Sequence, residues 1–417
     1  MNDFPTVECD KTSFADDFNV YTSDPDINVA VDKLNSDLSL ISEWARDHDL
    51  QIAPSKSSVT LFTPNTHEHN VHPQVKIEEP ADLGGVFGTV WVDRVVPLEQ
   101  QPRILGVKFD THFTFAPHAR EVAKNCTQRL KVLKALAGTS WGQDKETLSI
   151  TYKSLIRSKI DFAAPVWTPN VKKTSVRRLQ SIQNAGLRIV SGCVKMTAEE
   201  HLHTEAKMLS VSDHLQLLSA QYLASALRSS HPLHNLVTSP AGPRDMKGTL
   251  HSAFINDVQT YLANNTVPPQ NYNDVKNRIH ANYVTRAINN RQNPNVLNNA
   301  TPPVHVSDQD LPRAYRSALA QLRSGHCAAL NSYLSRVGRS DSPTCPECGV
   351  DAQTPSHLFN CASHPTNLVP LDLWLYPRRV ATFLETLPSF SHLPPLPPPP
   401  SLGDGNGRLL SLLPNPG

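Results

Sequence analysis

Residues Thr12–Val20 have the sequence TSFADDFNV, which places two adjacent aspartates, Asp16 and Asp17, between short apolar flanks. A strand normally excludes such a pair, because neighbouring carboxylates repel each other and both lose water on folding. The β-favouring flanks therefore predict two short strands over 13–22 that turn at the acidic pair. Both carboxylates would then lie at the tip of a β-hairpin.

An amphipathic helix is predicted directly after this hairpin. Asp24–Asp26 forms a helix start, and apolar residues follow at spacings of three and four up to about Leu50. Short strands are expected over 59–62 and 103–109, on either side of a stretch with little periodicity. The N-terminal part is therefore expected to mix helix and strand.

Helical periodicity dominates the rest of the chain, with apolar residues on one face and basic residues elsewhere on the cylinder. The predicted helices cover 118–137, 144–161, 174–190, 212–228, 272–290 and 311–337. The expected fold class is therefore α+β, in which a mixed N-terminal part precedes a mainly α-helical part.

Composition divides the chain further. Residues 231–308 are rich in Asn, Pro, His and Thr and are expected to form a poorly ordered connector. The last 28 residues contain HLPPLPPPPS and are expected to be extended and disordered, or to bind an SH3- or WW-type partner. The five expected regions are 1–115, 116–230, 231–308, 309–365 and a proline-rich tail over 366–417.

The overall composition is that of an ordinary folded protein. Of 417 residues, 39% are hydrophobic and 18% are charged, and no apolar run reaches the ~20 residues of a membrane helix. The acidic N-terminus lacks the features of a signal peptide, and seven scattered cysteines do not form a secreted disulfide framework. We therefore expect an intracellular protein, in the nucleus or cytoplasm, without a membrane partner.

The formal net charge of +1 conceals two opposite poles. Residues 1–50 carry twelve Asp or Glu against three Lys or Arg, whereas residues 118–195 carry fifteen Lys or Arg against four acids. Such poles suit a protein that binds metal ions at one place and a phosphate backbone at another. The alternative interpretation is that both poles are solvated helix faces.

The most specific motif is TCPECGVDAQTPSHLFNC, in which Cys345, Cys348, His357 and Cys361 have the spacing C-x2-C-x8-H-x3-C. Two cysteines that are separated by two other residues can turn around one ion. A His and a Cys four positions later share one face of a short helix. Four ligands predict a closed, structural zinc site in a small knuckle that binds nucleic acid. The alternative is three buried cysteines and a capped histidine.

The order of these features resembles a known family. After TSFADDFNV and its helix come LQIAPSKSSVTLF and RILGVKFDTHFTFAPHA, in that order. This succession resembles the palm and thumb of reverse transcriptases from non-LTR (LINE-like) retrotransposons, particularly the jockey and CR1-like branch. The resemblance covers about 12–365, with only patchy similarity over 230–308.

In that family an aromatic-x-Asp-Asp box binds the catalytic magnesium ions, and Phe14–Asp17 matches it. The resemblance therefore implies that Asp16 and Asp17 bind Mg²⁺, which would activate a primer 3′-hydroxyl. Lys56 corresponds to a lysine near the phosphates of the incoming nucleotide, although Ala53 stands where the family usually has Asn. Its alternative role is that of a solvated loop lysine.

Leu105–Val107 resembles the strand that grips the primer, where Gly106 would allow close backbone approach; the alternative is a simple turn. The basic helices correspond to the thumb, which follows the template and primer backbone, and the C-terminal helical stretch before the cysteines also matches. The expected phosphate contacts are Arg120, Lys124, Lys131, Lys134, Lys153, Arg157, Lys159, Arg177 and Arg178.

The resemblance implies an RNA template and a DNA primer as partners. Polymerisation in this family also needs a third carboxylate and the fingers, and only fifteen residues precede Asp16. We therefore expect the C-terminal part of a longer RNA-directed DNA polymerase, inactive without its upstream polymerase and endonuclease regions. The alternative is a non-catalytic zinc-knuckle protein that binds nucleic acid.

Overall fold

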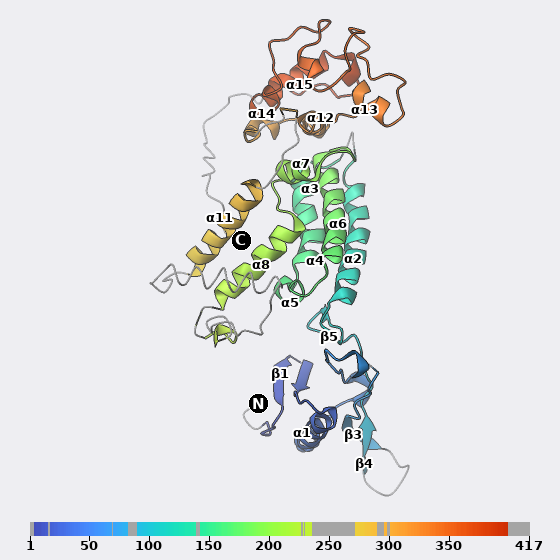
Figure 1. Ribbon diagram of the computed structural model, residues 1–417, viewed down its shortest axis with the longest axis vertical. Helices are drawn as coiled ribbons and strands as arrows, with labels where there is room; N and C mark the ends of the chain where they lie inside the picture. The colour runs from blue at the N-terminus through green and yellow to red at the C-terminus, as the bar shows by residue number, and fades with distance from the viewer. Residues whose placement is uncertain are drawn as a thin grey trace. The chain divides into compact units, whose positions relative to one another are not determined.

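The computed structural model divides into two compact units, 1–118 and 119–417 (Figure 1). Each unit has hydrophobic packing of its own. Its mixture of helices and short antiparallel strands agrees with the expected α+β class. The residues that the structure describes are 4–15, 17–68, 70–81, 90–138, 142–226, 228, 230–235, 272–289, 296–297 and 301–398.

The first unit begins with the predicted hairpin. Strands β1 (Asp10–Phe14) and β2 (Asp17–Tyr21) pair antiparallel, and Phe14 pairs with Asp17 next to the turn. The strands begin three residues earlier than the sequence pattern indicates. Asp16 lies outside the described residues, so its predicted position at the tip stays a prediction.

Helix α1 (Ile27–Asp47) confirms the predicted amphipathic helix. The side chain of Asp26 caps it by accepting a hydrogen bond from the Asn28 amide at 2.9 Å. The helix packs on a hairpin of β3 (Lys76–Ala81) and β4 (Val90–Val95), which the sequence did not predict. The core between them contains Val75, Ile77 and Val96, with Val31, Leu34 and Leu38 packed against it.

Two predicted strands of this unit are wrong in detail. Residues 59–62 form no strand, and Val59 makes only an isolated bridge to Leu98. The single strand predicted over 103–109 is a tight hairpin of β5 (Arg103–Ile104) and β6 (Val107–Lys108). Its turn includes Gly106 with a φ of 84°, a conformation that favours glycine. Short 3₁₀ turns complete the unit at η1 (Pro54–Lys56) and η2 (Thr66–Glu68).

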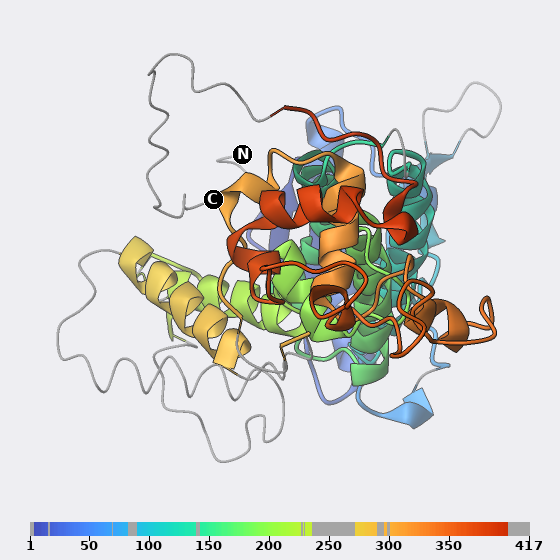
Figure 2. The same ribbon diagram turned by 90° about the horizontal axis from the view of Figure 1, so that it is seen from above.

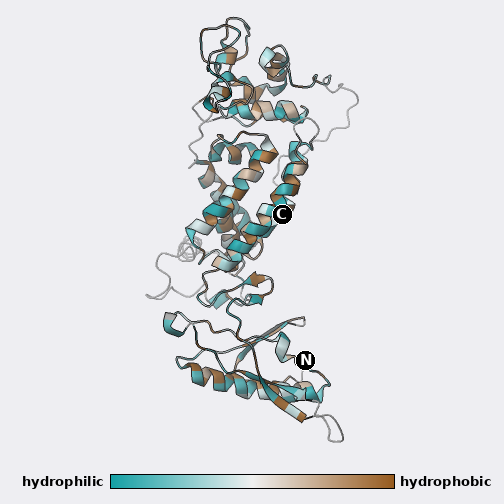
Figure 3. Ribbon diagram, turned by 90° about the vertical axis from the view of Figure 1, so that its right-hand side faces the viewer, coloured by the Kyte–Doolittle hydropathy of each residue, from teal (hydrophilic) through white to brown (hydrophobic). Residues whose placement is uncertain are grey.

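A bundle of helices forms the larger part of the second unit: α3, η3 and α4 follow one another along one rod, α6 and α2 lie beside this rod, and α11 lies along α8 (Figures 1 and 2). Each helix carries both hydrophilic and hydrophobic residues, as amphipathic patterning requires (Figure 3). The elements are α2 (Ala116–Ala135), α3 (Lys145–Tyr152), the π-turn η3 (Lys153–Arg157), α4 (Ser158–Asp161), α5 (Ala164–Trp167), α6 (Lys173–Ser191), α7 (Glu199–Ala206), α8 (Val211–Ser225) and α11 (Tyr272–Asn289).

Four of the predicted helices are confirmed to within a few residues, because each carries a long apolar period. The helix predicted over 144–161 is instead interrupted by the π-turn η3. Gly186 explains how closely two of these helices approach. A Cβ atom there would lie 2.6 Å from the ring of buried Tyr152, so α6 lies against α3 only because residue 186 has no side chain.

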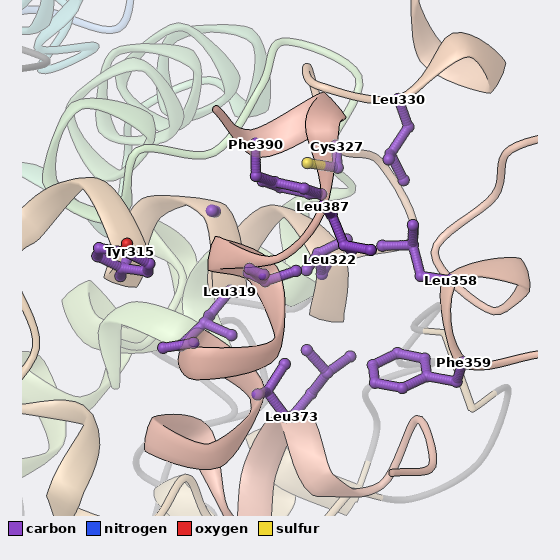
Figure 4. Packing of buried hydrophobic residues seen from close by; sticks show 14 of the residues in the cluster. Tyr315, Leu319, Leu322, Cys327, Leu330, Leu358, Phe359, Leu373, Leu387 and Phe390 are labelled. Atoms are coloured by element: carbon purple, nitrogen blue, oxygen red, sulfur yellow. The ribbon is translucent and has the colours of Figure 1, made fainter. Parts of the chain in front are cut away.

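Residues 301–398, here called the C-terminal module, surround a second core (Figure 4). Its elements are η4 (Val306–Asp308), α12 (Arg313–Arg323), α13 (Asn331–Arg336), η5 (His357–Phe359), α14 (Asp372–Leu375), α15 (Pro377–Glu385) and η6 (Pro388–Phe390). The single helix predicted over 311–337 is therefore two helices, and Gly325 between them has a φ of 75°.

The proline-rich region differs from its prediction. Two helices, α14 and α15, lie inside the tail predicted over 366–417, and they supply Leu373, Trp374 and Val380 to the core. The first part of the proline run is also attached, since the Tyr315 hydroxyl donates to the Pro394 carbonyl at 2.7 Å. Residues 399–417 lie outside the described part of the chain.

Buried charges join the C-terminal module to the bundle. The Arg323 guanidinium has no exposed surface, and it donates to Glu205 of α7 at 2.8 Å and to Asp308 of η4 at 2.5 Å. Lys145 of α3 reaches the same Glu205 oxygen at 2.7 Å. Burial alone would raise the pKa of Glu205, but the charges of Arg323 and Lys145 hold it well below its ordinary value. We call these four side chains the Arg323 network.

Acid should therefore weaken this unit. A carboxyl whose pKa is lowered in the folded chain contributes stability that is complete above its ordinary pKa and is lost as the pH falls below that value. We expect the free energy of unfolding to decrease progressively as the pH falls below the ordinary glutamate pKa of 4.5. Glu205→Gln should lower it by about 3–5 kcal/mol at neutral pH, because Arg323 and Lys145 lose their partner. Urea unfolding measures both effects. Hydrogen exchange of amides in α7 and α12 shows which part of the unfolding transition belongs to this unit.

The matched control is Asp93→Asn in the first unit, which removes an exposed partner of Lys76. Exposed pairs contribute at most about 1 kcal/mol, so this change should be small. A Glu205→Gln chain with wild-type stability at neutral pH would contradict the role given to the network.

Candidate metal centre and nucleic-acid interface

The four residues of the cysteine motif come together in the C-terminal module. One ligand atom each from Cys345, Cys348, His357 and Cys361 lies within 4.8 Å of the others. The two sulfurs of Cys345 and Cys361 are 4.0 Å apart, and the sulfur of Cys348 lies 3.4 Å from Nε2 of His357. A tetrahedral zinc ion would give edges of about 3.6–3.8 Å, so the arrangement fits four-coordinate zinc.

A tight turn brings the first two cysteines together. The Gly349 amide donates to the Cys345 carbonyl at 2.9 Å, and Gly349 has a φ of 68°, which explains the glycine after the second cysteine. The amides of Val350 and Asp351 donate to the Cys348 sulfur and lower its pKa to about 6. The thiolate form is the one that binds metal, so the turn prepares Cys348 as a ligand.

The ring of His357 is oriented for ligation through Nε2. Its other nitrogen, Nδ1, lies 3.7 Å from a carboxylate oxygen of Asp351. Metal-ligating histidines commonly present their second nitrogen to a carboxylate, which fixes the ring orientation. The sequence analysis missed Asp351, because an acid between the cysteine pair and the histidine has no characteristic spacing.

The cluster is part of the core of the module rather than a separate finger. Leu358 and Phe359, which follow His357 directly, are buried beside α12 and α14 (Figure 4). The buried side chain of Gln353 accepts from the Asn331 amide at 2.9 Å and donates to Ser389 at 2.7 Å. The loop that holds the ligands is therefore fixed from both sides.

The other predicted site residues of the first unit lie on three different elements. Asp17 is exposed at the start of β2, Lys56 is exposed at the end of η1, and Gly106 is exposed in the β5–β6 turn. Asp16 is outside the described residues. Phe14, the aromatic residue of the same motif, is also exposed.

Four of the predicted phosphate contacts form a single stripe on α2. Arg120, Lys124, Lys131 and Lys134 are exposed, and helical geometry places them within about 80° of one another around the axis. The opposite side of α2 is buried and carries Val122, Cys126 and Leu133. The stripe extends over fourteen residues, or about 21 Å. We call these four residues the α2 basic stripe.

The remaining predicted contacts divide into two groups. Arg157 is buried, donates to Gln183 and pairs with Asp161 at 3.2 Å, so its charge is already satisfied inside the bundle. We therefore no longer count Arg157 among the candidate phosphate contacts. The exposed residues are Lys153 on η3, Lys159 on α4, and Arg177 and Arg178 on α6.

Within the described part of the chain, no helix is long and apolar enough to cross a membrane. No protein-family model matches the chain, and no solved structure matches it either.

Curated relatives are found among polymerases of transposable elements. The chain is 24% identical over 237 residues to a probable RNA-directed DNA polymerase from transposon BS of Drosophila melanogaster, a match that covers 55% of the chain and 24% of the relative. It is 28% identical over 247 residues to a probable RNA-directed DNA polymerase from transposon X-element of the same species, covering 56% and 25%.

A third relative is the retrovirus-related Pol polyprotein from type-1 retrotransposable element R1 4 of Nasonia vitripennis, which is 24% identical over 127 residues, or 30% of the chain and 32% of the relative. The chain thus spans about a quarter to a third of the length of these relatives. The resemblance seen in the sequence is confirmed over about half of the chain, where the similar curated proteins are RNA-directed DNA polymerases of non-LTR retrotransposons at modest identity.

Proposed function

We propose that the chain is the part of a non-LTR retrotransposon reverse transcriptase that holds an RNA template paired with a DNA primer. The homologous polymerases support this role, and the α2 basic stripe is the observation that carries it. The four cations of the stripe lie on the exposed face of α2, opposite its buried face, so they do not contribute to the core. Their most direct use is contact with a polyanion.

The length of the stripe suits a nucleic-acid backbone. At about 3.4 Å of axis per phosphate, 21 Å corresponds to about six phosphates of one strand. Contacts of this kind fix the position of a duplex without reading its sequence, as a polymerase requires. Lys153, Lys159, Arg177 and Arg178 are the further candidate phosphate contacts on the same bundle.

We also propose Asp16 and Asp17 as the magnesium ligands of the assembled polymerase. Carboxylate oxygens are the ligands that Mg²⁺ prefers, and the exposed position of Asp17 beside the hairpin turn suits this role. When bound, the metal would activate the primer 3′-hydroxyl. Lys56 would lie near the nucleotide phosphates, and Gly106 would allow the primer backbone to approach.

The cysteine cluster is proposed to bind zinc for structural reasons. Three sulfurs and one imidazole nitrogen complete a tetrahedron, which leaves no open position for a reacting group. The ion would hold Cys345 and Cys361 together and thereby fix the loop against the core of the module. A nucleic-acid contact by this module remains part of the proposal.

Neutralising the stripe should weaken binding in a salt-dependent way. Because each phosphate contact releases counterions, the double variant Lys124→Gln, Lys131→Gln should reduce the slope of log K against log salt by about one to two. Affinity for an RNA–DNA hybrid should fall at low salt. Fluorescence anisotropy at several salt concentrations measures both quantities.

The control is Lys207→Gln, which removes an exposed lysine at the end of α7 without touching the stripe. Equal affinity and slope for the double variant and this control would rule out α2 as the binding surface.

Zinc should be bound stoichiometrically. We expect one zinc ion per purified full-length chain, and Cys348→Ser should abolish it, because a hydroxyl does not replace a thiolate ligand. Cys126→Ala, which changes a buried cysteine of the bundle, should leave the zinc content unchanged. Elemental analysis after dialysis against a weak chelator measures the ratio. A wild-type chain without zinc after expression in zinc-supplemented medium would refute the site.

A further inference from the structure

Phe113 presents an aromatic ring at the surface of the first unit. Its side chain is 41% exposed, an unusual value for a phenylalanine within a cluster of four. The ring stacks on Phe62, with centroids 4.6 Å apart and planes 25° apart. Phe109 and Phe115 support it at centroid distances of 6.2 Å and 6.4 Å. The Phe113 ring is therefore held in place by three other aromatic rings, while part of its surface is exposed to water.

The backbone holds this ring in a strained conformation. Phe113 and Phe115 have φ angles of 51° and 52°, in the left-handed region that residues other than glycine rarely adopt. The carboxylate of Asp110 stabilises the loop, because it accepts from the amide and hydroxyl of Thr114 at 3.1 Å and 2.8 Å, and from the Phe115 amide at 2.6 Å. Strained residues persist only when their surroundings fix them, and they gather at functional sites.

The charges on the adjoining hairpin are positive. Arg103 and Lys108 lie on β5 and β6, which lead directly into this loop. The nearest acid along the chain, Asp110, uses both carboxylate oxygens for the loop hydrogen bonds. An exposed aromatic face that follows a hairpin carrying Arg103 and Lys108 suits a nucleobase attached to a phosphate backbone.

We propose that Phe113, supported by Phe62, is a stacking platform for an unpaired base of the bound nucleic acid. This proposal rests on the proposed function and adds a ligand to it, namely a single-stranded base next to the duplex. Stacking does not depend on base identity, because every base has a π face. The platform would therefore position a strand without selecting its sequence.

The test compares two fluorescent substrates on the full chain. One is a blunt RNA–DNA hybrid, and the other carries a single-stranded overhang with 2-aminopurine, whose fluorescence falls on stacking. We expect Phe113→Ala and Phe113→Leu to weaken binding of the overhang substrate by about 5- to 150-fold and to lose the quenching. Phe113→Trp should keep both. Binding of the blunt hybrid should change little in any variant.

The matched control is Phe162→Ala, which removes a similarly exposed phenylalanine from the second unit and should behave as wild type. Phe113→Leu keeps an apolar side chain over Phe62. Thermal unfolding of this variant shows whether the fold is intact, so that a loss of binding can be attributed to the loss of stacking. If Phe113→Leu retains full binding and quenching, the ring is not a stacking platform. A wild-type chain that binds neither substrate refutes the proposed function as well, whereas normal binding by Phe113→Ala refutes this inference alone.

Discussion

The second unit depends on the burial of one guanidinium. Arg323 is fully enclosed, and an enclosed cation is tolerated only when its hydrogen bonds are satisfied by charged partners. Asp308 supplies one partner from within the C-terminal module, and Glu205 supplies the other from the bundle, so the bond to Glu205 connects the module to the bundle in a specific orientation. Apolar packing alone would tolerate a shift of α12 along the bundle. The directional bonds of Arg323 do not.

Helix α12 therefore has two different neighbours on its two faces. Leu319 and Leu322 lie in the core of the C-terminal module, together with Leu358 and Phe359, which follow His357 directly (Figure 4). On the other side, Arg313 donates to the Ile189 carbonyl at 2.7 Å, close to the last turn of α6, where helix carbonyls lack intrahelical partners.

The sequence predicted those features that are local and periodic. The hairpin at Asp17, helix α1 and the long helices of the bundle follow from alternation or from an apolar period, and the cluster of three cysteines and one histidine follows from their spacing. The hairpin of β3 and β4 was missed because charged residues and a proline at position 80 hide its alternation. Charge alone could not separate Arg157 from the exposed lysines, since its burial depends on contacts with α6.

Strain and long-range burial were equally invisible from the sequence. No residue pattern indicates that Phe113 adopts a positive φ, because the cause is the set of hydrogen bonds made by Asp110. The sequence of α14 and α15 was assigned to a proline-rich tail because a run of prolines follows these helices directly. Their burial is decided by a core whose other members begin at Leu311, more than sixty residues earlier.

The acidic pole of the first fifty residues illustrates how structure divides a charge cluster into roles. Asp37 is buried and accepts the Cys9 amide at 2.7 Å; burial opposes its ionisation, but the hydrogen bonds from Cys9 and Glu8 leave its pKa below the ordinary value. Asp26 caps α1, and Asp24 pairs with Lys33 at 2.9 Å. These three acids stabilise the fold through hydrogen bonds and an ion pair. The formal charge of residues 1–50 therefore overstates the number of carboxylates that are available to bind a metal ion. Asp17 is different, because it is exposed at a turn where a carboxylate contributes nothing to the core. The case for a magnesium site therefore rests on the exposed position of Asp17 and on the sequence motif that it shares with Asp16, and not on the charge of the region.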